Sequence, residues 1–364
     1  MKIYVLPISG GGFVSQIALL AEVYDATYDC DNTYDYHRSV RLGSKSAQPG
    51  TPDLVLASSG GNVAAYLAMV SGWSSSGLAQ NIKSVHSSIF VQPWTPPFLP
   101  SGIMFYSTKS IYRNGTGMDQ LFTSMFTPQS VKQTEIWSGT YNTNSQKGGM
   151  FCNLAKENAF LQDDLVEDGM ILYDCDPCTY VDGDLLTISK VVHASAAIPF
   201  VTEGIYIGED RYIDGGVAYS SPLIPMSEHL KASLKKRMDS NSMDERIVQL
   251  FYFCSYDMDQ RFNDSMYDTS IGALVHSSGL QDRAFALNFI RQFADVGVVP
   301  AKYDDLTSAK LRVILKGMQH KSFVIFLFPR NSVAVDVANF TTKQLIEYMN
   351  WAKKNYSAIV WCAK

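Results

Sequence analysis

Two short apolar segments, each followed by glycines and then by a helical pattern, constrain the fold of this chain most strongly. The first begins at Lys2 and reads KIYVLPI, SGGG and SQIALLAEVYDA. The second begins at Asp53 and reads DLVLA, SSG and GNVAAYLAMVSG. In both helical parts apolar residues recur at the spacing of an amphipathic helix. A strand, a glycine turn and a helix, found twice, predict parallel βα units. We therefore expect an α/β protein with a mostly parallel central sheet.

The rest of the chain supplies further strands and helices without a visible repeat or a long linker. We expect a hairpin over residues 134–153, a helix that Pro199 ends, and a strand after it that leads into Asp214-Gly215-Gly216. Later segments predict strands over 247–254 and 323–328, and helices over 225–238, 271–296 and 341–356. We interpret residues 1–364 as one α/β domain with insertions.

Composition excludes several classes of protein. The net charge is -5 and the basic residues are scattered, which argues against a nucleic-acid partner. No run of about 18 apolar residues is present, and the N-terminal apolar run is too short for a signal peptide. Six unevenly spaced cysteines do not resemble a disulfide framework. We expect a cytoplasmic or peripherally membrane-associated protein without a transmembrane segment.

Two adjacent serines, Ser58 and Ser59, stand between the second apolar strand and its helix. In a nucleophile elbow a serine occupies a strained strand-to-helix turn, and small residues are needed two places before and after it. Ala57 and Gly61 flank Ser59 in this way, whereas Leu56 precedes Ser58. Ser59 is therefore the better candidate nucleophile. A turn without catalytic function and a phosphate-binding loop remain alternatives.

Two glycine turns could serve such a nucleophile. Gly10, Gly11 and Gly12 follow the first strand, and their backbone N–H groups could form an oxyanion hole or a phosphate loop, although no nucleotide-binding motif is present. Asp214 stands on the glycine turn after a later strand. A lone aspartate there is ordinarily structural, so its interpretation depends on whether it reaches Ser59.

Three blocks, in order, resemble the patatin-like phospholipase family. SGGGFVSQIALLAEV is similar to its oxyanion loop and first helix, and ASSGGNVAAYLA to its G-x-S-x-G elbow. HASAAIPFVTEGIYIGEDRYIDGGVAYSSPL is similar to its A-S-x-A-x-P and D-G-G/A block. The blocks lie within residues 1–223, and residues 224–364 would complete the fold. The resemblance implies a patatin-like three-layer sandwich.

The same resemblance implies a lipid acyl hydrolase of phospholipase A type. Ser59 would be the nucleophile, Asp214 the general base, and Gly10, Gly11 and Gly12 the oxyanion hole, with no cofactor and no metal. Phospholipids or other lipid esters would be the substrates. A free carboxylate, with a pKa of about 3.9, is a weak base at neutral pH. We therefore expect Asp214 to be buried and within hydrogen-bond reach of Ser59 Oγ.

Some residues depart from the family pattern. Phe13, Val14 and Ser15 follow the glycines where the family often carries a cation, Ala57 replaces a glycine, and Ser220 or Ser221 replaces an asparagine. The missing cation leaves the oxyanion hole to backbone donors and the helix dipole. The missing cation therefore leaves a catalytically inactive lipid-binding protein as one alternative, and an acyltransferase of the same fold is another.

Other reactive side chains lack the spacing of a site. A histidine triad would need a late histidine, and His229, His276 and His320 are the candidates. Cys175 and Cys178 could be redox-active or half of a zinc site, but no second pair of cysteines follows at metal spacing.

The apolar segment from Trp94 to Tyr106 could contact a membrane surface or pack over the core.

Overall fold

The structure is a computed structural model that describes the greater part of the chain. Its described residues are 2–8, 52–86, 89, 91–93, 112–115, 117–161, 174–199, 201–219, 224–226, 247–253, 301–304, 306–318, 321, 323–330 and 341–362.

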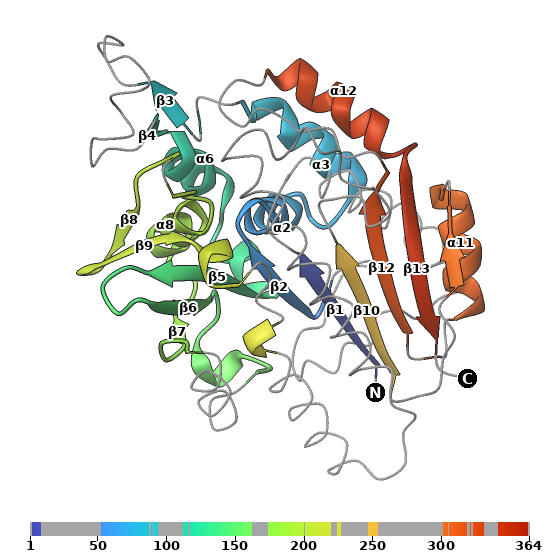
Figure 1. Cartoon of the computed structure of the whole chain (residues 1–364), viewed down its shortest axis with the longest axis horizontal. Helices are drawn as coiled ribbons and strands as arrows, with labels where there is room; N and C mark the ends of the chain where they lie inside the picture. Colours follow the sequence, from blue (N-terminus) through green and yellow to red (C-terminus); the bar gives the residue numbers. More distant parts are fainter. Residues whose placement is uncertain are drawn as a thin grey trace, which may run out of the picture.

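Strands and helices are interspersed along the described residues (Figure 1). The strands are β1 (Lys2–Ile8), β2 (Leu54–Ser58), β3 (Val91–Pro93), β4 (Tyr112–Asn114), β5 (Glu135–Asn142), β6 (Lys147–Cys152), β7 (Thr179–Tyr180), β8 (Ile205–Ile207), β9 (Asp210–Asp214), β10 (Ile247–Phe253), β11 (Ala301–Tyr303), β12 (Phe323–Pro329) and β13 (Tyr356–Cys362). The α-helices are α2 (Gly60–Val70), α3 (Ser75–Asn81), α6 (Gly117–Met125), α8 (Leu185–Ser195), α11 (Ser308–Gly317) and α12 (Thr342–Ala352). Short 3-10 turns include η5 (Gly215–Val217).

The large sheet is mixed, so the expectation of a mostly parallel sheet is wrong. Its central strands β12, β10, β1, β2 and β5 are parallel to one another. At one edge β13 and β11 are added antiparallel, and at the other β6 and the β8–β9 hairpin run antiparallel to their neighbours. The two strand–turn–helix segments that predicted a parallel sheet contain β1 and β2, and both strands belong to the parallel centre of the sheet. β6 follows β5 and β9 follows β8 through short turns, which permit antiparallel pairing.

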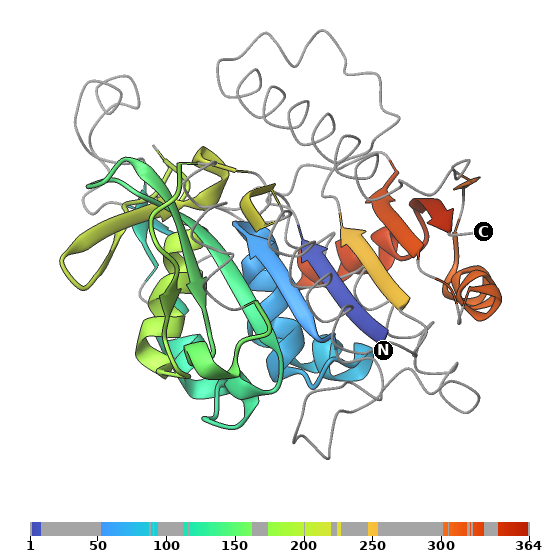
Figure 2. The same ribbon diagram turned by 90° about the horizontal axis from the view of Figure 1, so that it is seen from below.

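Both faces of the central strands β2 and β12 are buried, which explains their nearly continuous apolar sequences. In β2, Val55 and Ala57 belong to the core that the described helices cover, whereas Leu54 and Leu56 belong to a second core on the opposite face. The second core also contains residues from the segments around 154–161, 175 and 226. Figure 2 shows α2 lying along one side of the row of strands. The predicted helices over 15–26 and 271–296 lie outside the described residues, so the three-layer arrangement stays a prediction.

The helix predicted over 341–356 is shorter in the structure than in the sequence pattern. The closing helix α12 ends at Ala352, and the segment from Tyr356 forms β13, which pairs with β12. Hydrophobic spacing in the helix continues into the strand, but the β-branched and aromatic residues of YSAIVWC favour an extended chain. Among the described helices none has the length and apolar character needed to cross a membrane.

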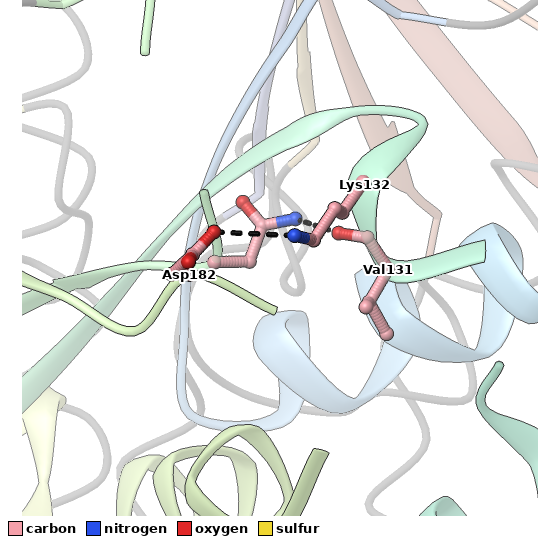
Figure 3. A network of polar contacts seen from close by, with 4 residues as sticks. Val131, Lys132 and Asp182 are labelled. Carbon is pink, nitrogen blue, oxygen red and sulfur yellow. Dashed lines mark hydrogen bonds and ion pairs between the residues drawn. The ribbon is translucent and has the colours of Figure 1, made fainter. Parts of the chain in front are cut away.

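Helix α8 is anchored firmly at its first turn. The Asp184 side chain accepts a hydrogen bond from the Thr187 backbone N–H at 3.0 Å and caps the helix. Just before the cap, Asp182 pairs with Lys132 at 3.2 Å, beside the backbone of Val131 (Figure 3). Gly183 N–H donates to the Asn153 carbonyl at 2.8 Å. The Asp182–Lys132 and Gly183–Asn153 contacts connect the start of α8 to the segments that flank the β5–β6 hairpin.

Candidate active site

Strand β5 brings the ends of β2 and β9 together. Ser58, the last residue of β2, pairs with Gly139 of β5 in parallel register. Asp214, the last residue of β9, pairs with the next residue, Thr140, in antiparallel register. β6 pairs along β5 as well, so β2 and β9 share the remaining edge and approach each other end to end. The residue after β2, Ser59, therefore lies beside Asp214.

Ser59 occupies a strained turn between β2 and α2. Its backbone angles are φ 53° and ψ -134°, a region that costs a residue with a side chain about 1–3 kcal/mol. Ser59 is the N-cap residue of α2, yet its side chain makes no capping hydrogen bond. An N-cap serine ordinarily accepts from the first turn of its helix. At this position the hydroxyl is instead directed away from the helix backbone, as in a nucleophile elbow.

The Ser59 hydroxyl donates a 2.6 Å hydrogen bond to Asp214 Oδ2. This is the length of a charge-assisted O–H···O⁻ bond. The other carboxylate oxygen, Oδ1, accepts from Gly216 N–H at 2.7 Å, and Asp214 N–H donates to the Ala197 carbonyl at 3.0 Å. The contact expected from the sequence between two residues 155 positions apart is therefore present.

Burial makes the Asp214 carboxylate more basic than a solvated aspartate. The residue is 5% exposed, and desolvation raises its carboxyl pKa to about 6, although hydrogen bonds from Ser59 and Gly216 oppose the shift. Most Asp214 side chains are thus ionised at pH 7 and can accept a proton. The raised pKa makes the carboxylate a better base than a solvated aspartate.

Ser58 has surroundings unlike those of Ser59. It is completely buried, and its Oγ has no hydrogen-bond partner among the described residues. Ser59, by contrast, is 9% exposed and donates to Asp214. The two neighbouring serines therefore differ in both exposure and hydrogen bonding.

Gly215 permits the close approach of η5 to the elbow. A Cβ at this position would lie 2.4 Å from the Gly139 carbonyl oxygen and 2.6 Å from Ser58 Oγ. The carbonyl belongs to β5 and cannot move without disturbing the sheet. A residue with a side chain at position 215 would therefore push Asp214 away from Ser59.

We expect Gly215→Ala to lower the free energy of unfolding by about 1–3 kcal/mol because the added methyl overpacks the junction. It should also slow any reaction of Ser59 by at least about tenfold, since the 2.6 Å contact would lengthen. Denaturant unfolding and the rate of covalent labelling of Ser59 measure both effects. Gly317→Ala is the matched control, because a Cβ there meets nothing within 4 Å. Equal stability of the two variants would contradict this account of Gly215.

The N-terminus of α2 supplies backbone donors next to Ser59. The first N–H groups of a helix have no acceptor within that helix, and here they belong to Gly60 and Gly61. No acidic residue stands in the first turn of α2 itself, so none of the helix's own side chains neutralises the positive end of its dipole. The predicted oxyanion donors Gly10, Gly11 and Gly12 lie outside the described residues. β1 ends at Ile8, which pairs with Ala57 beside the elbow.

Ser195, the last residue of α8, also contacts Ser59, and the sequence pattern assigned it no role. Its Oγ accepts a hydrogen bond from Ser59 N–H at 3.0 Å and donates one to the Gly139 carbonyl at 2.6 Å. The residue is completely buried. Its position in the segment HASAAIP, within the block that resembles the family, was the only signal in the sequence.

The other reactive candidates take no part in the described contacts of Ser59 and Asp214. His193 lies on α8 with its Nδ1 3.5 Å from Asp119 Oδ1. His229, His276, His320 and Ser220 and Ser221 lie outside the described residues, as does the segment from Trp94 to Tyr106. Burial raises the pKa of the Cys175 thiol to about 12, which makes it a poor nucleophile. Within the described residues no group of three or more His, Cys, Asp and Glu side chains could hold a metal ion.

Geometrically, the site joins a strained serine, a buried carboxylate of raised pKa and the N-terminus of a helix. Such an arrangement can deprotonate the serine hydroxyl and stabilise negative charge beside it. Neither the models of known protein families nor the curated proteins contain a match to this chain.

Proposed function

We propose that this chain is a serine ester hydrolase in which Ser59 is the nucleophile and Asp214 the general base. The observation that carries the proposal is the 2.6 Å hydrogen bond from Ser59 Oγ, on a strained elbow, to the buried Asp214 carboxylate. A serine held as a structural cap would bond to its own helix, and this serine does not.

The reaction begins when Ser59 Oγ attacks the ester carbonyl carbon. Asp214 Oδ2 takes the hydroxyl proton as the new C–O bond forms, and the carbonyl oxygen becomes an oxyanion. Gly60 N–H, the first backbone donor of α2 and the residue after the nucleophile, would donate to that oxyanion. As the tetrahedral intermediate collapses, the protonated Asp214 transfers its proton to the departing alkoxide, and an acyl-Ser59 ester and an alcohol result.

Water completes the cycle by the reverse sequence. Asp214 removes a proton from the water as it attacks the acyl-Ser59 carbonyl, and then returns a proton to Ser59 Oγ as the carboxylic acid leaves. The base reaches the serine directly, so this path needs no intervening imidazole. The Asp214 pKa of about 6 suits both acylation and deacylation, because in each step the carboxyl must accept and then release a proton near neutral pH.

We further propose that the substrates are phospholipids or related lipid esters and that the chain has the patatin-like three-layer fold. Support comes from the sequence blocks around the glycine loop, the elbow and the D-G-G turn, which resemble that family in order. The described parallel strands and the Ser59–Asp214 contact are compatible with that resemblance.

Labelling with a fluorophosphonate probe, followed by peptide mass spectrometry, tests the proposed chemistry. We expect a phosphonyl group on Ser59, together with release of fatty acid and lysophospholipid from phosphatidylcholine vesicles. Glycerol added as a competing acceptor distinguishes hydrolysis from acyl transfer by the appearance of acylglycerol. A folded protein that binds the vesicles but takes up no probe would contradict the proposal and favour an inactive lipid-binding protein.

A further inference from the structure

One short segment at the end of α8 contacts both members of the Ser59–Asp214 pair. Ser195 Oγ accepts from Ser59 N–H at 3.0 Å, and two residues later the Ala197 carbonyl accepts from Asp214 N–H at 3.0 Å. The segment itself is held in a tight turn, since Ala197 N–H donates to the Ala194 carbonyl. α8 and α2 pack against the same core, beside each other in Figure 1. The separation of nucleophile and base therefore depends on the end of one helix.

The Ser195 hydroxyl bridges the point at which the β2–β5 ladder stops. The last pair between β2 and β5 is Ser58 and Gly139, so the buried Ser59 N–H is not part of the regular strand pairing. Ser195 Oγ lies between that N–H and the Gly139 carbonyl and bonds to both, at 3.0 and 2.6 Å. A buried N–H without an acceptor costs about 1–3 kcal/mol, so this acceptor favours the turn that Ser59 adopts. The φ of 53° at Ser59 is thus held by a side chain from a distant helix.

Resting on the proposed function, we propose that Ser195 is a positioning residue for the nucleophile. Its hydroxyl bonds to two backbone groups, the Ser59 N–H and the Gly139 carbonyl. It acts through the Ser59 backbone, because the direction of the Oγ toward Asp214 follows from the orientation of that backbone. A change at Ser195 should therefore slow the chemical step and leave substrate binding nearly unaltered.

The test compares Ser195→Ala with Ser189→Ala. Ser189 is another completely buried serine of α8, but its Oγ has no hydrogen-bond partner among the described residues. We expect Ser195→Ala to lower kcat and the rate of fluorophosphonate labelling by about 10- to 100-fold, with KM within about twofold of wild type. Ser189→Ala should keep both rates within about twofold. Circular dichroism and a denaturant curve verify that each variant is folded in the assay.

Two further variants keep the inference testable if Ser195→Ala does not fold. Ser195→Thr retains the bridging hydroxyl and should keep kcat within about fivefold, whereas Ser195→Cys retains the size but bonds weakly and should lose about tenfold or more. A folded Ser195→Ala or Ser195→Cys with wild-type kcat overturns the inference, as does a change confined to KM.

Wild type and Ser59→Ala are assayed alongside these variants. If wild type takes up no probe, the proposed function fails and this inference fails with it. If wild type is labelled and the Ser195 variants are labelled equally fast, only this inference fails.

Discussion

Replacing Ser59 with alanine is expected to lower ester hydrolysis by about 10⁴- to 10⁶-fold and to abolish labelling by a fluorophosphonate. The substitution removes the attacking oxygen, whereas the strand, the helix and the Asp214 carboxylate remain in place. Any remaining rate would come from direct attack by water. Steady-state hydrolysis of a chromogenic ester, together with mass spectrometry of the labelled protein, measures the effect.

Ser58→Ala is the matched control, one residue away. Its hydroxyl is completely buried and has no hydrogen-bond partner among the described residues, so its removal eliminates a desolvated polar group. We expect full labelling and an unfolding free energy equal to that of wild type or higher by about 1 kcal/mol. Loss of labelling in Ser58→Ala with retention in Ser59→Ala would show that the neighbouring serine is the nucleophile.

Asp214→Asn is expected to lower kcat by about 10²- to 10⁴-fold, because an amide cannot take the proton from Ser59. In the wild type the same group should govern the pH dependence. Its carboxyl pKa of about 6 implies that kcat/KM rises as the pH passes through 6 and then levels off. Asp214→Asn should show a low rate without that inflection. A wild-type profile that is flat from pH 5 to pH 8 would contradict the role of Asp214.

The same substitution should stabilise the protein above pH 6. The native carboxyl titrates near 6 and the unfolded one near 3.8, so between these values the native state binds more protons than the unfolded state. Wild-type stability therefore falls as the pH rises from about 4 to about 6 and is constant above that range. The asparagine side chain of the variant carries no charge and avoids this loss, which amounts to about 3 kcal/mol. Its amide oxygen can still accept from Gly216 N–H.

Denaturant unfolding at pH 4 and pH 8 measures the difference in stability. We expect the two proteins to unfold alike at pH 4, and Asp214→Asn to be the more stable at pH 8. Asp182→Asn serves as the control, since Asp182 is an exposed carboxylate in a surface ion pair and its replacement should change stability by less than about 1 kcal/mol. If Asp214→Asn were less stable than wild type at pH 8, the burial of the Asp214 charge would not be what limits the stability of the wild type.

Much of the candidate site follows from local sequence. Small residues around Ser59 identify the serine that a tight strand-to-helix turn can expose, and the glycines after Asp214 identify a turn that can approach another backbone closely. These features are local because they depend on steric limits within a few residues. The same is true of α8 and of the β5–β6 hairpin, both of which the sequence predicts and the structure contains.

Ser195 and the edges of the sheet could not be predicted in the same way. A serine near the end of an amphipathic helix has no local feature that reveals an acceptor for a backbone N–H 136 residues away. The antiparallel strand β13 was hidden because its apolar residues continue the pattern of α12. Which neighbour a strand pairs with, and in which direction, depends on contacts between distant segments.

The sequence by itself determined the local geometry: a strand, an elbow that presents Ser59, and a glycine turn behind Asp214. Only the tertiary structure decided that the two side chains meet, because β5 aligns Ser58 and Asp214 with its adjacent residues Gly139 and Thr140. It also decided the chemistry of Asp214, since the pKa of about 6 comes from burial against segments far away in the chain. Turn sterics act over a few residues, whereas strand register and desolvation depend on the assembled fold.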